Sequence, residues 1–300
     1  MHIRLATLAA ALLLAAAPVL AQQDFSKVEI KTTRLSPTVS MLVGSGGNLA
    51  VSAGEDTVFL VDDQYAPLTP KILAAVQALS SKPVQFVLNT HWHGDHTGGN
   101  DNLGKAGVVI VAHENVRKRM GAEQFNEVFK SKTAPSPKAA LPIVTFTGAM
   151  AFHLNGEDIR ILHMPRAHTD GDSIVHFAGS DVVHMGDTFF NGMYPFIDGS
   201  TGGTIDGTIA ACDQVLGMVT EQTKIIPGHG PLAAKADLKA YREMLSTVAA
   251  RMRKAIAEGQ SDEDIAKSGM LADLDDKWGK GFLKSADFLK VTVPTLRKAG

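Results

Sequence analysis

A histidine-rich stretch follows an apolar run, where Val84-Gln-Phe-Val-Leu88 leads into Asn89-Thr-His91-Trp-His93-Gly-Asp95-His96. The apolar run is typical of a strand buried on both faces, so we expect the polar residues to lie at its end. Because alternate residues of an extended chain share a face, His91 and His93 point the same way, while Asp95 and His96 can address a second point nearby. Imidazole nitrogens and carboxylate oxygens are the usual ligands of catalytic zinc, so the stretch predicts a metal centre.

Three later segments complete a known pattern. They are Pro165-Arg-Ala-His168, His184-Met-Gly-Asp187 and Ile225-Ile-Pro-Gly-His229-Gly. With the first stretch they resemble the metallo-β-lactamase superfamily over most of the chain after residue 21. The resemblance implies that the ligands of two zinc ions per chain are His91, His93 and His168 for one ion, Asp95, His96 and His229 for the other, and Asp187 between them. It also implies that Asp62 supports the metal site by accepting a hydrogen bond from a ligating histidine.

The hydrophobic pattern predicts a mixed α/β fold. Four short strands between residues 28 and 61 are separated by turn residues and form a meander, and further strands alternate with helices up to residue 226. Residues 131–142 read as a surface loop. The resemblance implies a four-layer αββα sandwich, with a single domain over 22–300 and a short helical C-terminal extension over 258–300. Cys212 falls in a predicted helix and is expected to be a small core residue.

The N-terminus has the features of a secretory signal peptide. A basic start at Met1–Arg4 precedes an almost wholly apolar run from Leu5 to Leu20, and small residues lie before Gln22. This order predicts cleavage after Ala21 and export, most simply to a bacterial periplasm. The rest of the sequence has no apolar run long enough to span a bilayer, so we expect no stable membrane insertion after cleavage.

Composition restricts the partners. The 300 residues carry 29 basic and 31 acidic side chains, giving a net charge of −2. Phosphate binding needs a basic surface, so we expect a small-molecule substrate and no nucleic acid. The single cysteine allows neither an intramolecular disulfide nor a cysteine-rich zinc site.

The resemblance implies a hydrolase that uses a metal-bound hydroxide on an activated carbonyl, most simply a cyclic amide or ester, with Asp95 handling the proton. The alternatives are a lactonase or a thioesterase of the glyoxalase II-like branch, and a metal-binding accessory protein without turnover. A sulfate ester or phosphodiester substrate stays open, as do iron and manganese. The aromatic segment after Asp187 could wall the pocket, and there Tyr194 could donate to a carbonyl oxygen.

Overall fold

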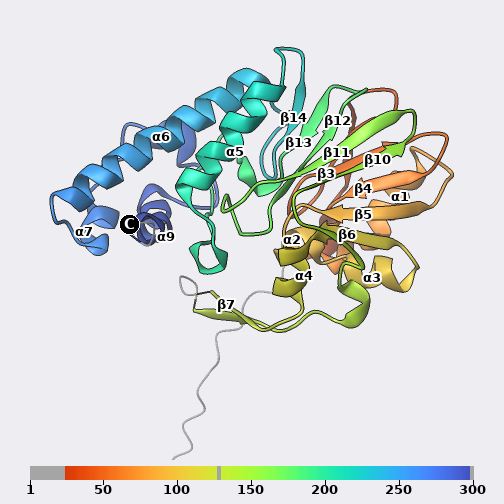
Figure 1. Ribbon diagram of the computed structural model, residues 1–300, viewed down its shortest axis with the longest axis horizontal. Coiled ribbons are helices and arrows are strands. Elements are labelled where there is room, and N and C mark those ends of the chain that lie inside the picture. The colour runs from red at the N-terminus through yellow and green to blue at the C-terminus, as the bar shows by residue number, and fades with distance from the viewer. Residues whose placement is uncertain (1–23, 127–129, 298–300) are drawn as a thin grey trace, which may run out of the picture.

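The first half of the chain builds a seven-stranded sheet. The computed structural model, which describes residues 24–126 and 130–297, orders it β1-β2-β3-β4-β5-β6-β9 (Figure 1). Its strands are β1 Lys31–Arg34, β2 Val39–Val43, β3 Leu49–Ala53, β4 Val58–Val61, β5 Val84–Asn89, β6 Val109–His113 and β9 Val144–Phe146. β1 to β4 form an antiparallel meander, and β4, β5, β6 and β9 run parallel. The predicted signal peptide, residues 1–21, lies outside the described residues.

The second half builds a five-stranded sheet in the order β10-β11-β12-β13-β14. Its strands are β10 Ala149–Leu154, β11 Glu157–His163, β12 Ser173–Phe177, β13 Val182–His184 and β14 Lys224–Ile226. Its first three pairings are antiparallel, whereas β13 and β14 run parallel. The carboxyl ends of β13 and β14 therefore lie at one edge, which is where ligands bind in open α/β sheets.

Helices cover the outer face of each sheet. α1 (Thr69–Gln77) and α3 (Asn100–Lys105) pack on the first sheet, while α5 (Ile205–Met218) and α6 (Lys235–Ala257) pack on the second. β4 shows the layering, because Phe59 and Val61 face the core between the sheets and the alternate residues face the α1 side. The αββα sandwich that the resemblance implied is confirmed, and Cys212 is buried beneath α6 as expected.

The shorter elements complete the chain. They are η1 Phe25–Lys27, η2 Ala66–Leu68, α2 Gly94–Thr97, α4 Glu114–Met120, η3 Lys138–Ala140, η4 Gly186–Thr188 and η5 Gly199–Thr201. A small hairpin of β7 (Gln124–Asn126) and β8 (Ser131–Thr133) replaces part of the loop predicted over 131–142. All three β8 side chains are exposed, so the strand has no hydrophobic alternation that the sequence could have revealed.

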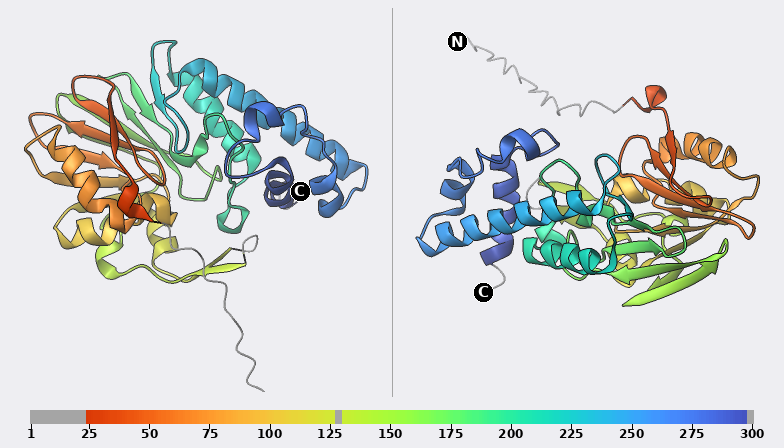
Figure 2. Two further views of the ribbon diagram at one scale, coloured as in Figure 1. Left: turned by 180° about the vertical axis from the view of Figure 1, so that it is seen from behind. Right: turned by 90° about the horizontal axis from the view of Figure 1, so that it is seen from above.

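The C-terminal extension consists of α7 (Asp262–Lys267), α8 (Asp275–Trp278) and α9 (Ser285–Arg297). It lies at the end of the molecule remote from α1 (Figure 2). Phe288 and Trp278 are buried, at 0% and 4% exposure, in the hydrophobic cluster that also contains the inner faces of α5 and α6. The helical tail is thus part of the packing of the second sheet and its helices.

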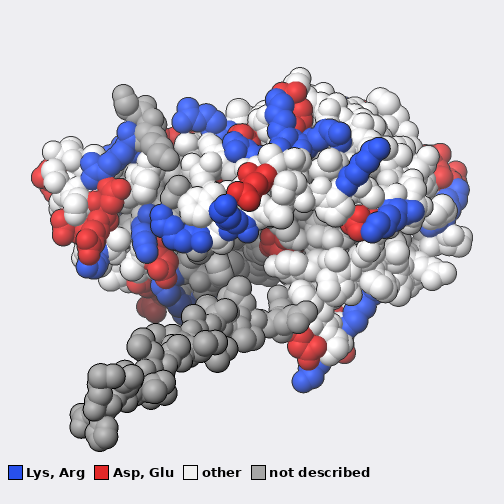
Figure 3. Space-filling model, turned by 90° about the horizontal axis from the view of Figure 1, so that it is seen from below, with Lys and Arg blue, Asp and Glu red and all other residues white. Residues whose placement is uncertain are grey.

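The surface carries mixed charge. On the face viewed from below, basic and acidic side chains lie beside one another with uncharged surface between them (Figure 3). Among the described residues, basic and acidic side chains also pair along helices, as in Lys118 with Glu114 at 2.8 Å and Lys105 with Asp101 at 2.5 Å. Within the described ranges, the helices are too short or too polar to cross a membrane.

Removing a ring from the extension should destabilise the whole protein. Phe288→Ala deletes a fully buried side chain, and we expect a loss of about 3–5 kcal/mol in the free energy of unfolding. Lys290→Ala, on the exposed side of the same helix, is the control and should change it by less than about 0.5 kcal/mol. Denaturant unfolding measures both, and equal, small losses would show that the extension folds separately.

Candidate metal centre

Seven predicted ligand side chains converge between the two sheets. His91, His93, Asp95 and His96 follow β5 and enter α2, His168 lies between β11 and β12, and Asp187 and His229 follow β13 and β14. They form two groups, in each of which the potential ligand atoms lie within 4.8 Å of one another. The first group contains His91, His93, His168 and Asp187, and the second contains Asp95, His96 and His229.

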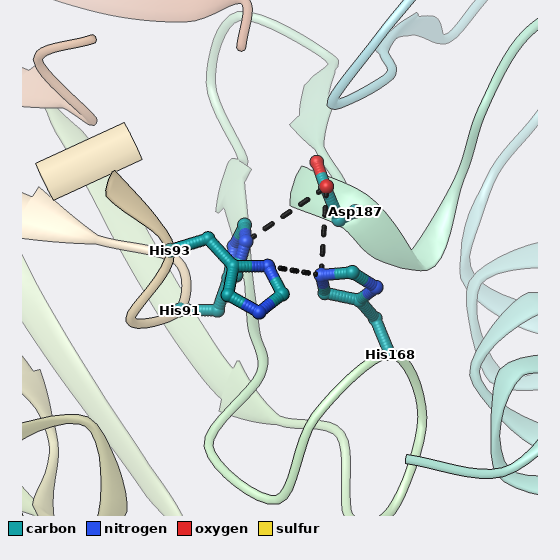
Figure 4. A group of neighbouring side chains, drawn as sticks. All are labelled: His91, His93, His168 and Asp187. Carbon is teal, nitrogen blue, oxygen red and sulfur yellow. Dashed lines mark hydrogen bonds and ion pairs between the residues drawn. The ribbon is translucent and has the colours of Figure 1, made fainter. Parts of the chain in front are cut away.

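The first group is compact (Figure 4). His93 Nδ1 lies 2.9 Å from His168 Nε2, and His168 Nε2 lies 3.5 Å from Asp187 Oδ2. His91 Nε2 lies 3.8 Å from the same carboxylate oxygen. Three imidazole nitrogens therefore face one carboxylate, and they come from two different loops.

Asp187 also reaches the second group. Its Oδ1 lies 3.0 Å from His96 Nε2, and its Oδ2 lies 3.5 Å from His229 Nε2. Within that group His229 Nε2 lies 3.3 Å from Asp95 Oδ2, and the two histidines are 3.4 Å apart. Asp187 thus lies between the groups, as the resemblance implied.

Each histidine of the β5 loop has its outer nitrogen bound to an acceptor, which leaves the inner nitrogen free for a cation. His96 Nδ1 donates to Asp62 Oδ2 at 2.8 Å, and His93 Nε2 donates to Asp198 Oδ2 at 3.1 Å. His91 Nδ1 donates at 3.1 Å to the hydroxyl of Thr90, which itself donates to Asp62. Asp62 is fully buried and occupies the supporting place that the resemblance implied.

His168 is fixed in the same way, because its Nδ1 donates to the carbonyl of Phe196 at 2.7 Å. The sequence alone did not indicate these roles for Asp198, Thr90 or the Phe196 carbonyl. The requirement for one acceptor per histidine predicts that such partners exist. It does not place them, because Asp198 is 105 residues from His93 in the chain.

The donor set fits a metal ion. His91 is fully buried, and its Nε2 has no hydrogen-bond partner among the described residues although it points at Asp187. A buried polar atom without a partner is costly unless something absent from the protein chain satisfies it. Nitrogen and carboxylate donors crowded around such an atom suit a divalent cation such as zinc.

The ionisation of the ligand side chains also fits a site for a cation. Although burial favours the neutral acid, His96 and His229 lower the pKa of the Asp95 carboxyl to about 2. Burial lowers the pKa of His168 to about 4, so this ring is a neutral donor at pH 7. Burial also favours neutral His229, but Asp187 and Asp95 outweigh it and raise the pKa of the ring to about 9.

Glycines allow backbone to pack directly on the ligands. A Cβ atom at Gly47 would lie 2.1 Å from Cε1 of His96, and one at Gly228 would lie 2.1 Å from Oδ1 of Asp187. Neither separation is possible between real atoms, so both positions require glycine. The ligands are thereby enclosed from the side of β2 and β14. On the open side, Asp95, His93 and His229 remain 17–24% exposed.

The aromatic segment after Asp187 splits into two sets. Phe190 stacks on His229 with ring centroids 5.1 Å apart, and the ring of Phe196 lies 5.9 Å from those of His93 and His168. These two therefore flank the ligands. Phe189 instead packs on Tyr241 in the hydrophobic cluster.

Tyr194 belongs to the buried set, so the prediction that its hydroxyl donates to a substrate carbonyl oxygen is wrong. It is 1% exposed, stacks on Phe288, and donates its hydroxyl to Asp275 Oδ1 at 3.0 Å. Its backbone N–H donates to the carbonyl of Trp278 at 2.9 Å. The hydroxyl of Tyr194 is therefore bound by the C-terminal extension. The sequence of its own loop could not reveal this distant partner.

Residues 44–240 match the sequence model of the Metallo-beta-lactamase superfamily. The fold and the two ligand groups are those of a metal-binding α/β sandwich, and the matched residues include both groups. The chain belongs to the metallo-β-lactamase superfamily.

Curated relatives are distant. The chain is 26% identical over 207 residues to the Beta-lactamase-like protein 2 homolog of Caenorhabditis elegans, covering 67% of this chain and 58% of that protein. It is 24% identical over 219 residues to the Hydroxyacylglutathione hydrolase of Polaromonas sp., covering 73% and 74% respectively. The chain thus spans less than two thirds of the first of these relatives.

Solved structures share the fold. A metallo-beta-lactamase from Pontibacter korlensis superimposes with a TM-score of 0.59 at 17% identity, covering 73% of this chain and 99% of that one. The DIM-1 metallo-beta-lactamase gives a TM-score of 0.58 at 19% identity, covering 74% and 99%. About a quarter of this chain therefore has no counterpart in either structure.

Protons should compete with metal at the second group. With a His229 pKa of about 9 in the metal-free protein, metal binding near neutral pH must displace a proton from this ring. We therefore expect the affinity of the second group to rise between pH 7 and pH 9. The first group should gain much less, since His168 is already neutral. Chelator-competition titrations across this range measure both affinities, and an identical pH dependence of the two would contradict the assignment.

Tyr194→Phe should affect stability and leave the metal centre intact. The change removes the hydrogen bond to Asp275 and keeps the ring that stacks on Phe288. We expect the free energy of unfolding to fall by about 1.5–3 kcal/mol, since the acceptor is charged. Metal content and turnover should stay within about twofold of the wild-type values. A large loss of turnover at unchanged stability would show that the Tyr194 hydroxyl takes part in the reaction.

Proposed function

We propose that the protein is an exported, periplasmic hydrolase that holds two zinc ions and opens an activated carbonyl compound, most simply a cyclic amide or ester. The observation that carries this proposal is the placement of Asp187. It is 5% exposed and lies within 4 Å of ligand atoms in both groups. A carboxylate in this position suits a centre for two ions that act on one substrate.

Metal ions bound here would supply a water molecule activated at neutral pH and would polarise the substrate carbonyl. The residues of the chain do the rest. Asp187 keeps the two groups together, and the acceptors behind the histidines keep their inner nitrogens directed at the centre. Asp95 is 23% exposed on the open side and is ionised, so it can accept a proton and return it to the leaving atom.

The surroundings of the ligands favour an uncharged acyl group. Phe190 and Phe196 flank the histidines, and the segment from Thr188 to Asp198 contains no lysine or arginine to bind a substrate carboxylate. Aromatic walls with few polar groups are typical of sites for apolar small molecules. Partial exposure of Asp95, His93 and His229 leaves the centre reachable, which an accessory protein that only stores metal would not require.

A thioesterase or lactonase is the second candidate. It is supported by relatives described as Hydroxyacylglutathione hydrolase and, at 25% identity over 141 residues, as Atrochrysone carboxyl ACP thioesterase of Aspergillus terreus. It is also supported by the ligand set, which places Asp187 where cysteine-using β-lactamases of the superfamily carry their cysteine. The periplasmic location is proposed from residues 1–21 alone and favours substrates found outside the cytoplasm.

Metal analysis and a substrate panel test the proposal. The purified protein should contain close to two zinc ions per chain, and the zinc-loaded enzyme should hydrolyse nitrocefin, a homoserine lactone or a thioester ahead of a phosphodiester. Asp95→Asn should lower turnover of the best substrate by at least about a hundredfold, because an amide cannot carry the proton. Asp213→Asn, on the exposed face of α5, is the matched control.

A single tight metal ion would refute the two-ion centre. Full activity of Asp95→Asn would remove this carboxylate from the reaction. Hydrolysis of the phosphodiester alone would overturn the acyl substrate class. Accumulation of the mature protein in the cytoplasm would overturn the periplasmic assignment.

A further inference from the structure

The turn between β2 and β3 reaches every member of the second ligand group. Gly46 packs on Asp95, where an added Cβ would lie 3.2 Å from the Asp95 Cβ, and Gly47 packs on the ring of His96. The backbone N–H of Gly47 donates to the carbonyl of Asp95 at 3.1 Å. Asn48, the next residue, contacts the loop that carries His229.

Asn48 binds the backbone on both sides of His229 in the chain. Its Nδ2 donates to the carbonyls of Pro227 and Gly230, at 2.9 Å each. Its backbone N–H donates to the carbonyl of Gly228 at 2.7 Å. Three donors of one residue, which is 3% exposed, thus bind three carbonyls of a four-residue loop.

The same residue connects this loop with the loop of Asp187. The carbonyl of Asn48 accepts from His184 Nε2 at 2.9 Å, and His184 Nδ1 accepts from the backbone N–H of Gly186 at 3.2 Å. Gly228 closes the ring by donating to the carbonyl of Gly186 at 2.8 Å. His184 is fully buried, so these bonds are shielded from competing water.

The other hydrogen bonds of the His229 loop come from the segment after β13 and from the pairing of its own two ends, Ile225 and Ala233. Gly228 and Gly230 have no side chains, and Gly230 has a φ of +100°, which favours glycine. The carbonyl of His229 accepts from Asn191 on the opposite side, at 2.9 Å. Loss of the Asn48 amide would leave the buried carbonyl of Pro227 and the partly buried carbonyl of Gly230 without this donor, and we expect the loop to move in response.

We propose that Asn48 is the positioning residue of the second metal site. It sets the place of His229 relative to Asp95 and His96, and the glycines before it allow the turn to approach these ligands. The inference rests on the proposed function, in that the second group holds a metal ion. Asn48 acts here through its amide nitrogen, which binds backbone carbonyls and has no free lone pair for a cation.

Asn48→Asp tests the proposal, since it keeps the shape and replaces the donor by an oxygen that repels both carbonyls. The matched control is Asn155→Asp. Asn155 lies in the turn between β10 and β11, is also buried, and donates from its Nδ2 to the hydroxyl of Ser52 in β3. Zinc titrations against a chelator should show at least about a tenfold loss of affinity at the second site of Asn48→Asp. The first site should stay within about threefold, and the control should match the wild-type protein at both sites.

Hydrogen exchange on the metal-free proteins gives a second readout. The amide of Gly228 should lose protection in Asn48→Asp and keep it in Asn155→Asp, while amides of β12 keep theirs in both. Unchanged zinc affinities in Asn48→Asp overturn the proposal, as does an equal loss at both sites. A wild-type protein that binds one zinc ion overturns the two-ion function instead, and the protection of Gly228 then decides whether Asn48 holds the loop.

Discussion

The carboxylate of Asp187 is the interaction on which the centre depends. It is almost completely buried and lies within 4 Å of nitrogen atoms of four histidines, from both ligand groups. A buried carboxylate is costly unless positive charge lies near it, and His96 and His229 lower the pKa of Asp187 well below its usual range despite burial. The two sheets bring these groups together, because the ligands lie in loops that directly follow β5, β13 and β14.

Much of this could be predicted from the sequence. The spacing of His91, His93, Asp95 and His96 after an apolar run indicates a strand end with ligands, and the strands from β2 to β6 show clear hydrophobic patterns. The layered sandwich followed from the resemblance, and its core is built as the alternation in β4 requires. Patterns of this kind are local, so a single sequence reveals them.

Long-range partners could not be predicted. Asp198 bonds to His93, and Asn48 bonds to Pro227 and Gly230, across 105, 179 and 182 residues respectively. Nothing in the local sequence marks either residue, because an aspartate before Gly-Ser and an asparagine after Gly-Gly are ordinary turn residues. Tyr194 was misassigned for the same reason, since its true partner, Asp275, is 81 residues further along the chain.

The last helices contact the segment that lies beside the metal ligands. Residues of α9 pack against η5, which adjoins Asp198, and Phe288 stacks on Tyr194 in the loop that carries Phe190 and Phe196. The last helices therefore back the segment that carries Phe190, Phe196 and Asp198, although they contribute no metal ligand themselves. A chain that stops near residue 240 would contain every predicted ligand and would lack these supporting contacts.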